Sequence, residues 1–161
     1  MRKFEKISFE EFCKDISNSK ELYDEYNIPK RSTKYSAGYD FSLLEDLVLE
    51  PNQIKKVPTG IKASMNDDEV LFIIIRSSLG FKYNIRLTNQ VGVIDKDYYN
   101  NDSNEGHIYV SICNEGKDTL NLKKGDRFAQ GIFVKYLKVE DEEEITELRT
   151  GGTGSTNKEE K

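Results

Sequence analysis

Short apolar runs, separated by glycine, proline, asparagine and aspartate, recur through most of the chain. They are rich in β-branched and aromatic residues and read LVLEP, KKVPTGIKA, EVLFIIIRS, IRLTNQVGVID, HIYVSICN, TLNLKKG and FAQGIFVKY. In HIYVSICN, apolar Ile108, Val110 and Ile112 alternate with Tyr109, Ser111 and Cys113, which predicts a strand with two distinct faces. This rhythm is typical of an all-β sandwich or barrel, here over residues 28–139.

A different pattern precedes the strands, over residues 1–27. Ser8 and Glu11 fit a capping box, and Phe9, Phe12 and Ile16 follow at helical spacing, so we predict a short amphipathic helix near residues 9–16. A second helix is expected over residues 20–26. This extension either packs on the outside of the barrel or binds a partner, and the sequence leaves both roles open.

Polar segments mark a loop and the chain end. NNDSNEG, residues 100–106, holds almost no apolar side chain and is expected to be a loop. The acidic run 140–144 is expected at the surface, and residues 149–161, RTGGTGSTNKEEK, form a tail too rich in Gly, Ser and Thr to pack by itself. With 161 residues the chain fits a single domain, 1–161.

Composition narrows the function classes. Lys and Arg number 24 against 29 Asp and Glu, a formal net charge of −5, which argues against a nucleic-acid binder that depends on phosphate neutralisation. No apolar run approaches the roughly 20 residues of a membrane span, and the start of the chain lacks a signal-peptide core. We therefore expect a cytoplasmic protein with no membrane partner.

The few sulfur and imidazole groups offer little catalytic chemistry. Cys13 and Cys113 stand far apart without a CxxC motif and are expected to be reduced thiols. The only histidine, His107, is expected to be a solvated residue at a strand edge. The sequence therefore gives little support to catalysis by a Ser-His or Cys-His pair.

The stretch NQVGVIDKDYY, residues 89–99, carries carboxylates directly after an apolar run. One interpretation is a buried strand that ends in a polar turn. The other is that Asp95 is a general base at the rim of a pocket, positioned and partly desolvated by the apolar strand.

Four further motifs hold candidate site residues, and three of them offer donors that suit phosphate. AGYDF places Asp40 among small residues, RSSLGFK follows a strand with Arg76 and two hydroxyls, GDRFAQGIF holds Arg127 and Gln130, and RTGGTGST combines Arg149 with glycines and hydroxyls. Each motif alone also fits an ordinary polar turn or, for the last, a flexible tail.

Taken together and in this order, the five motifs resemble those of the homotrimeric dUTP diphosphatases (dUTPases), over residues 37–156. The resemblance implies a distorted β-barrel or jelly roll with one or two short N-terminal helices and a flexible C-terminal tail. It implies hydrolysis of dUTP to dUMP and pyrophosphate, with Mg²⁺ held mainly by the phosphates. It also implies a homotrimer whose active sites are shared between subunits.

The resemblance also assigns roles to residues. Asp95 matches the general base, Asn89 with the backbone of Val93 and Ile94 matches the uracil-reading group, and Tyr98 matches the residue beneath the deoxyribose. Asp40 matches a carboxylate near Mg²⁺ that acts through water. The remaining expected substrate-binding residues are Arg76, Ser77, Ser78, Tyr109, Gln130, Arg149, Thr153, Gly154, Ser155 and Thr156.

Two rival functions stay open. A dCTP deaminase shares the fold and an RSS-type phosphate motif, but it requires a glutamate beside the base, and the intact NxxGVIDxDY run argues against it. A non-catalytic nucleotide sensor on the same fold is the other rival, although the presence of Asp95 favours an enzyme.

The loop 100–106 is longer than is usual in the family.

Thr153 stands where the family's tail usually carries an aromatic residue that stacks on uracil. Losing one stacking contact weakens substrate binding and raises the KM by up to about tenfold. We therefore expect Thr153→Phe to lower the KM for dUTP in steady-state assays; an unchanged KM would show that stacking plays no part.

Overall fold

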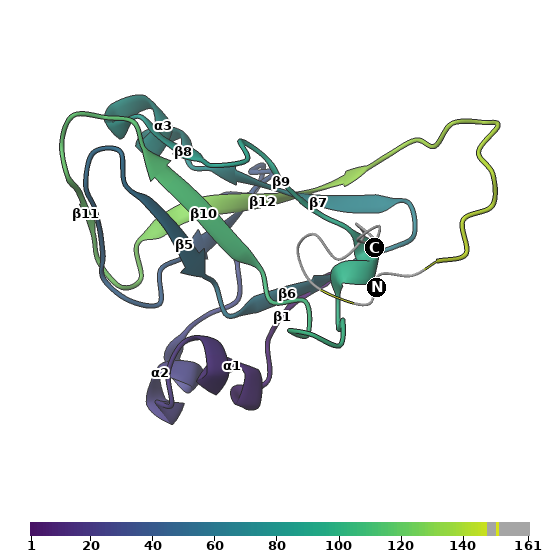
Figure 1. Cartoon of the computed structure of the whole chain (residues 1–161), viewed down its shortest axis with the longest axis horizontal. Helices are drawn as coiled ribbons and strands as arrows, with labels where there is room; N and C mark the ends of the chain where they lie inside the picture. Colours follow the sequence, from purple (N-terminus) through teal and green to yellow (C-terminus); the bar gives the residue numbers. More distant parts are fainter. Residues whose placement is uncertain (148–150, 152–161) are drawn as a thin grey trace, which may run out of the picture.

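The computed structural model describes residues 1–147 and residue 151. These residues form three short helices, one 3₁₀ turn and a series of strands (Figure 1). In chain order these are β1 (Lys3–Lys6), α1 (Phe9–Asp15), α2 (Lys20–Glu25), β2 (Lys30–Arg31), β3 (Tyr39–Ser42), β4 (Leu47–Leu49), β5 (Ile54–Pro58), β6 (Ile61–Ser64), β7 (Glu69–Ile75), α3 (Ser77–Tyr83), β8 (Ile85–Leu87), β9 (Gly92–Ile94), η1 (Lys96–Tyr98), β10 (Tyr109–Asn114), β11 (Leu120–Leu122) and β12 (Arg127–Lys135).

The strands associate in antiparallel sheets. The largest has five strands in the order β2-β3-β12-β7-β9, and a second has the order β5-β10-β8. The strands β1 and β6 form a further pair, and so do β11 and β4. In Figure 1, β7 and β12 run side by side across the molecule while β5 and β10 lie together. The predicted all-β barrel or jelly-roll fold is therefore confirmed.

The core lies between the sheets and is filled by large apolar side chains. Strand β7 lies inside its sheet between β12 and β9, and no residue of its apolar run is fully exposed. The alternation predicted around β10 holds up to Ile112, since Ile108, Val110 and Ile112 are buried and Tyr109 and Ser111 are less so, but it ends at Cys113, which is also buried. The largest fully buried apolar residues are Phe12, Phe41, Phe128, Ile7, Leu49, Ile61, Leu71, Ile73, Ile85, Ile108 and Ile112.

The N-terminal segment is part of this core. Both predicted helices are present, and the Ser8 hydroxyl caps α1 by accepting a hydrogen bond from the Glu11 amide at 3.1 Å. Phe12 stacks on Tyr26 with 5.5 Å between ring centroids, and the Tyr26 hydroxyl donates to the Gly60 carbonyl at 2.8 Å. The segment therefore packs on the barrel, which is the first of the two roles that the sequence left open.

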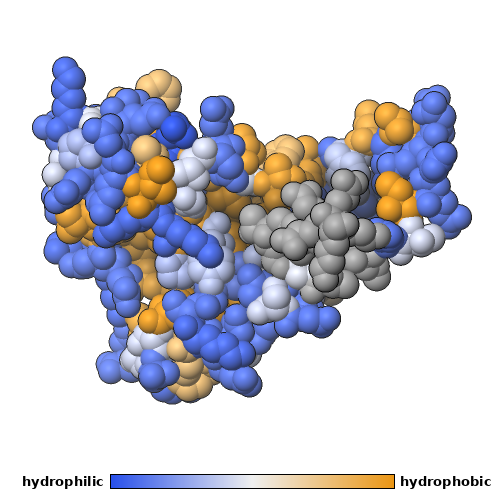
Figure 2. Space-filling model, in the orientation of Figure 1, coloured by the Kyte–Doolittle hydropathy of each residue, from blue (hydrophilic) through white to orange (hydrophobic). Residues whose placement is uncertain are grey.

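The chain leaves the barrel after β12 as an extended arm. Figure 1 shows this segment projecting beyond the end of β7, and Figure 2 shows apolar surface on it. Leu137, Val139 and Ile145 are all exposed there. The acidic run 140–144 is exposed as expected. Cys13 and Cys113 are both free, which confirms the expectation of unpaired thiols.

An ion pair ties the start of the chain to the start of β7. Glu69 is only 2% exposed, and its carboxylate accepts two hydrogen bonds from Arg2 and one from the Asn66 amide at 3.0 Å. The hydrogen bonds from Arg2, followed by those from Asn66, lower the pKa of Glu69 to about 2. The carboxylate is thus a stronger acid in the folded chain than in the unfolded chain.

This difference predicts an acid-dependent loss of stability. Because the unfolded chain binds the proton more tightly, the contribution of Glu69 is complete above its ordinary pKa of 4.5 and disappears as the pH falls toward about 2. Urea unfolding at fixed protein concentration should show the stability of the wild type falling through this range. Glu69→Gln should flatten that slope, whereas Glu10→Gln, at an exposed position, should leave it unchanged. Equal slopes in all three proteins would contradict the assignment.

Candidate active site

Three of the sequence motifs meet at one end of the five-stranded sheet. Strand β12 lies between β3 and β7, and its register pairs Gln130 with Asp40 on one side and with Ile74 on the other. Arg76 follows β7 directly and is the N-cap residue of α3. The sheet therefore brings Asp40, Arg76 and Gln130 together from three distant parts of the sequence.

Asp40 is held between two guanidinium groups. Its Oδ1 lies 3.2 Å from Arg76 Nε, and its Oδ2 lies 2.9 Å from Arg127 Nη1. The Ser32 hydroxyl also donates to Oδ2, and Arg76 donates to the Arg127 carbonyl at 3.3 Å. We call Asp40, Arg76 and Arg127 the arginine cluster. The two guanidinium groups and the one carboxylate together carry a net positive charge, which favours the binding of phosphate oxygens.

Further donors surround the arginine cluster. Ser77 and Ser78 begin α3 and are exposed, while buried Leu79 anchors the helix to the barrel. The Gln130 side chain lies directly against the backbone of Gly38. Only glycine allows this approach, because a Cβ at residue 38 would lie 2.2 Å from Gln130 Oε1. Beside Asp40 lies a polar cavity of about 260 Å³, whose lining includes Lys30 and Arg31. The structure thus brings together the expected phosphate-binding residues of motifs two and four.

A second cavity lies beside β9 and the turn before it, which carry motif three. It has a volume of about 460 Å³, and we call it the Asn89 cavity. Ile73, Leu87 and Val110 supply apolar walls, while the backbone of β9 passes along it. Its lining residues are Lys56, Ile73, Leu87, Thr88, Asn89, Gly92, Val93, Ile94, Tyr109, Val110 and Ser111. Apolar walls with a few polar groups are typical of a site for a small ring-containing ligand.

Asp95 directly follows β9 but lies away from the arginine cluster. The register of β7 and β9 pairs Leu71 with Ile94, so Asp95 stands opposite Val70. Arg76 comes six residues after Val70 along the strand direction, which corresponds to about 20 Å. Asp95 is exposed in the single chain, so this chain by itself does not supply the desolvation expected from the sequence.

Tyr98 occupies a different environment from the one expected. Its side chain is 8% exposed, and its hydroxyl donates to the His107 carbonyl at 2.8 Å and accepts from Asn104 Nδ2 at 3.0 Å. It is not among the lining residues of the Asn89 cavity. In this chain Tyr98 therefore fixes the loop 100–106, which is a loop as predicted, to the barrel.

The prediction for His107 is wrong. Instead of being solvated, its side chain is 0% exposed, with Nδ1 2.8 Å from Asp15 Oδ2 and Nε2 accepting from the Gly60 amide at 2.9 Å. Burial lowers the pKa of His107 more than Asp15 raises it. The mistake arose because the polar residues before His107 suggested a surface position, while its partners are far away in the sequence.

Three groups around these cavities were missed by sequence reasoning. Lys56 lines the Asn89 cavity, Ser32 contacts the arginine cluster, and Asp15 contacts the wall residue Tyr109. None of them lies in a motif, so no local signal could identify them. Arg149, Thr153, Gly154, Ser155 and Thr156, also expected at the site, lie outside the described residues.

Among the described residues, no group of three or more His, Cys, Asp or Glu side chains could hold a metal ion. Both oxygens of Asp40 face arginines, so this carboxylate does not fit a metal bound directly by protein. No helix within the described part has the length and apolar character needed to cross a bilayer.

The fold and these two sites define a class: a small β-barrel protein suited to a phosphorylated ligand that contains a ring. A family model described as dUTPase matches residues 24–157. The chain belongs to the dUTPase family. It is therefore a member of a family of hydrolases, since the relatives that it matches are named as nucleotidohydrolases.

Individual relatives agree with this membership. The deoxyuridine 5'-triphosphate nucleotidohydrolase of Lactococcus lactis is 49% identical over 131 residues, which cover 81% of this chain and 87% of the relative. That of Coxiella burnetii is 38% identical over 144 residues, 85% of this chain and 91% of the relative.

Solved structures show the same fold. The dUTPase of Streptococcus mutans superposes with a TM-score of 0.69 at 38% identity, covering 85% of this chain and 98% of that chain. A dUTPase from phage phi11 of S. aureus, described with a structural Mg(II) ion, gives a TM-score of 0.67 at 20% identity, covering 92% and 98%. At that identity the second likeness concerns the fold alone.

Proposed function

We propose that this protein hydrolyses dUTP to dUMP and pyrophosphate. The observation that supports the proposal is the segment 89–95, in which the base-reading candidate Asn89 lines the Asn89 cavity and the candidate general base Asp95 directly follows the cavity-lining strand β9. Membership of the dUTPase family supplies the substrate class. The proposed role is to keep uracil out of DNA and to provide dUMP for thymidylate synthesis, in the cytoplasm.

In the proposed mechanism, uracil enters the Asn89 cavity. Asn89 and the backbone of Val93 and Ile94 pair with the edge of the base, and the apolar walls exclude water. A site with such polar groups rejects a base that leaves them unpaired, because the unpaired groups keep their desolvation cost. The residues that line the cavity include no glutamate, so the described site offers no counterpart to the glutamate of a deaminase.

The chemical step then takes place at the α-phosphate. Asp95 accepts a proton from a water molecule as the water oxygen bonds to the α-phosphorus, and the bond from that phosphorus to the bridging oxygen breaks to release pyrophosphate. Arg76, Ser77, Ser78 and Gln130 contact the phosphates and stabilise the charge on the leaving group. Mg²⁺, when it binds with the triphosphate, neutralises charge on the phosphate oxygens.

One chain cannot provide both halves of this site. A general base acts within about 3 Å of the water that it deprotonates, whereas Asp95 and Arg76 are about 20 Å apart along the sheet. The exposed apolar residues of the C-terminal arm and exposed Val93 in β9 also favour burial against other chains. We therefore propose a homotrimer in which Asp95 of one subunit faces the arginine cluster of another.

Product analysis tests the reaction. The protein is incubated with Mg²⁺ and, separately, dUTP, dCTP, dTTP and UTP, and the products are separated by chromatography. We expect only dUTP to give its monophosphate and pyrophosphate, and Asp95→Asn to lower kcat by about 10²-fold to 10⁴-fold because the general base is lost.

A matched control separates the role of Asp95 from a general effect of charge. Asp102→Asn changes an exposed aspartate of the loop 100–106 and should keep full activity. Conversion of dCTP to a uracil nucleotide would support the deaminase instead. Nucleotide binding with no turnover would support the sensor.

Subunit complementation tests the shared site. Asp95→Asn and Arg76→Ala should each be inactive, but an equimolar mixture refolded together should recover roughly a quarter of the activity of refolded wild type, because each shared site draws its two halves independently. Circular dichroism establishes that both variants fold. A mixture that stays as inactive as its parents would place the whole site within one chain.

A further inference from the structure

The N-terminal segment and the loop 100–106 are joined to each other. The Ser8 amide donates to Glu105 Oε2 at 3.0 Å, and the Ser8 hydroxyl donates to the other oxygen at 2.5 Å. Glu105 thus takes the place that a capping-box glutamate would occupy at the start of α1. The Tyr99 hydroxyl also donates to Glu5 in β1. The N-terminal segment and the loop 100–106 therefore form one unit on the barrel.

At its other end, α1 contacts the wall of the Asn89 cavity. Asp15, the last residue of α1, accepts hydrogen bonds through Oδ2 from His107 Nδ1 at 2.8 Å and from the Tyr109 hydroxyl. Because the Gly60 amide donates to His107 Nε2, that nitrogen carries no proton, and Nδ1 is the donor to Asp15. The carboxylate therefore holds two donors that lie more than ninety residues away in the sequence.

The electrostatics agree with this geometry. Burial and then Asp15 raise the pKa of Tyr109, so its hydroxyl remains a donor. Desolvation raises the pKa of Asp15, but hydrogen bonds from Tyr109 and His107 lower it overall, so the carboxylate remains an acceptor. Burial keeps His107 neutral by lowering its pKa.

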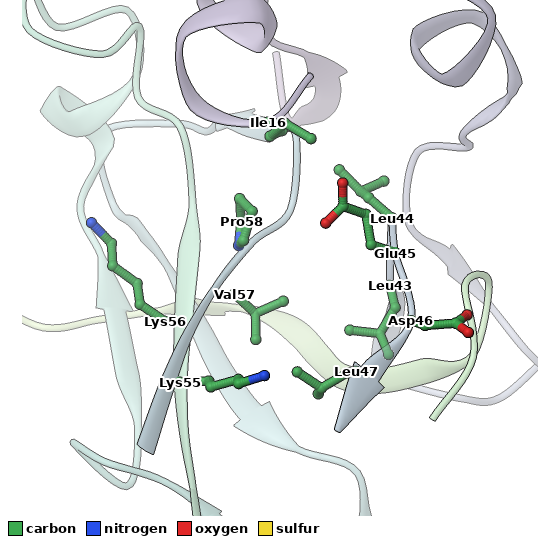
Figure 3. A pocket seen from close by; sticks show the side chains of 10 residues that line it. All are labelled: Ile16, Leu43, Leu44, Glu45, Asp46, Leu47, Lys55, Lys56, Val57 and Pro58. Carbon is green, nitrogen blue, oxygen red and sulfur yellow. The ribbon is translucent and has the colours of Figure 1, made fainter. Parts of the chain in front are cut away.

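The Tyr109 ring is fixed by two further contacts. The His107 ring lies 4.2 Å from it, centroid to centroid, and Lys56 Nζ lies 3.8 Å from its centroid. Lys56 comes from β5, and Figure 3 shows it directed away from the side chains of Leu43 and Leu47. Both Tyr109 and Lys56 line the Asn89 cavity. The ring is thus a fixed part of the cavity wall.

We propose that Asp15 is a positioning residue for the nucleobase site: it holds Tyr109 against the Asn89 cavity and thereby sets how tightly a uracil nucleotide fits. The N-terminal helix is then part of the substrate site without touching the substrate. This inference rests on the proposed function, since it assumes that the cavity receives the base. Asp15 is not among the residues that line either cavity, so we expect the effect on substrate binding and not on the chemical step.

The test uses the full-length protein and four variants: Asp15→Asn, Tyr109→Phe, the two combined, and Glu10→Gln. Glu10 is on the same helix with a side chain that is 84% exposed, so its variant controls for loss of charge. We expect Asp15→Asn to raise the KM for dUTP roughly fivefold, the net worth of one ordinary hydrogen bond, with kcat unchanged. Tyr109→Phe should have a similar effect, and the double variant should be no worse than either alone.

Calorimetric titration with dUMP is the second measurement, because it does not depend on turnover. The dissociation constant should rise in parallel with KM in the Asp15 and Tyr109 variants and stay constant in Glu10→Gln. Urea unfolding of the same proteins tests whether Asp15 has a purely structural role. Such a role would lower the stability of Asp15→Asn while leaving KM and dUMP affinity unchanged.

The outcomes distinguish this inference from the proposed function. If the wild type hydrolyses dUTP but Asp15→Asn leaves both KM and dUMP affinity unchanged, the inference is overturned and the proposed function stands. Additive effects in the double variant would also overturn it, since Asp15 would then not act through Tyr109. If the wild type binds dUMP but does not hydrolyse dUTP, the proposed function fails, and the dUMP affinities alone decide whether Asp15 positions Tyr109.

Discussion

The pairing of β12 with both β3 and β7 is the constraint on which the rest of the structure depends. The strand is central, so its backbone donors and acceptors are used on both sides, and its register with each neighbour is fixed. Asp40, Arg76 and Gln130 become neighbours only through this register. A shift of one residue would turn Gln130 toward the opposite face and separate it from the other two.

The same sheet determines where the halves of the site lie. Because β9 pairs with β7 in the opposite direction, Asp95, which follows β9, lies at the end of β7 that is remote from Arg76. A rigid antiparallel sheet does not bend enough to close such a distance. The exposed apolar residues on the arm after β12 are consistent with the proposal that the missing half comes from another subunit.

The N-terminal segment connects the outside of the barrel to the Asn89 cavity. Its aromatic residues are packed into the core, so α1 has little freedom to move relative to β5 and β10. This rigidity makes a single carboxylate at the end of α1 an effective partner for His107 and Tyr109. Partly buried hydrogen bonds to a charged group are stronger than those between neutral groups, which suits a contact that orients a side chain.

The sequence by itself determined the local features and the family. The alternation of apolar residues gave the strands, Ser8 and the spacing of Phe9 and Phe12 gave the first helix, and the order of the five motifs gave the dUTPase resemblance. These signals are local because periodicity and capping act over a few residues. The tertiary structure alone decided the burial of His107, the position of Tyr98, the contact between Asp15 and Tyr109 and the separation of Asp95 from Arg76. Each depends on which surfaces meet when distant strands pair and pack, and no pattern within a short window of sequence contains that information.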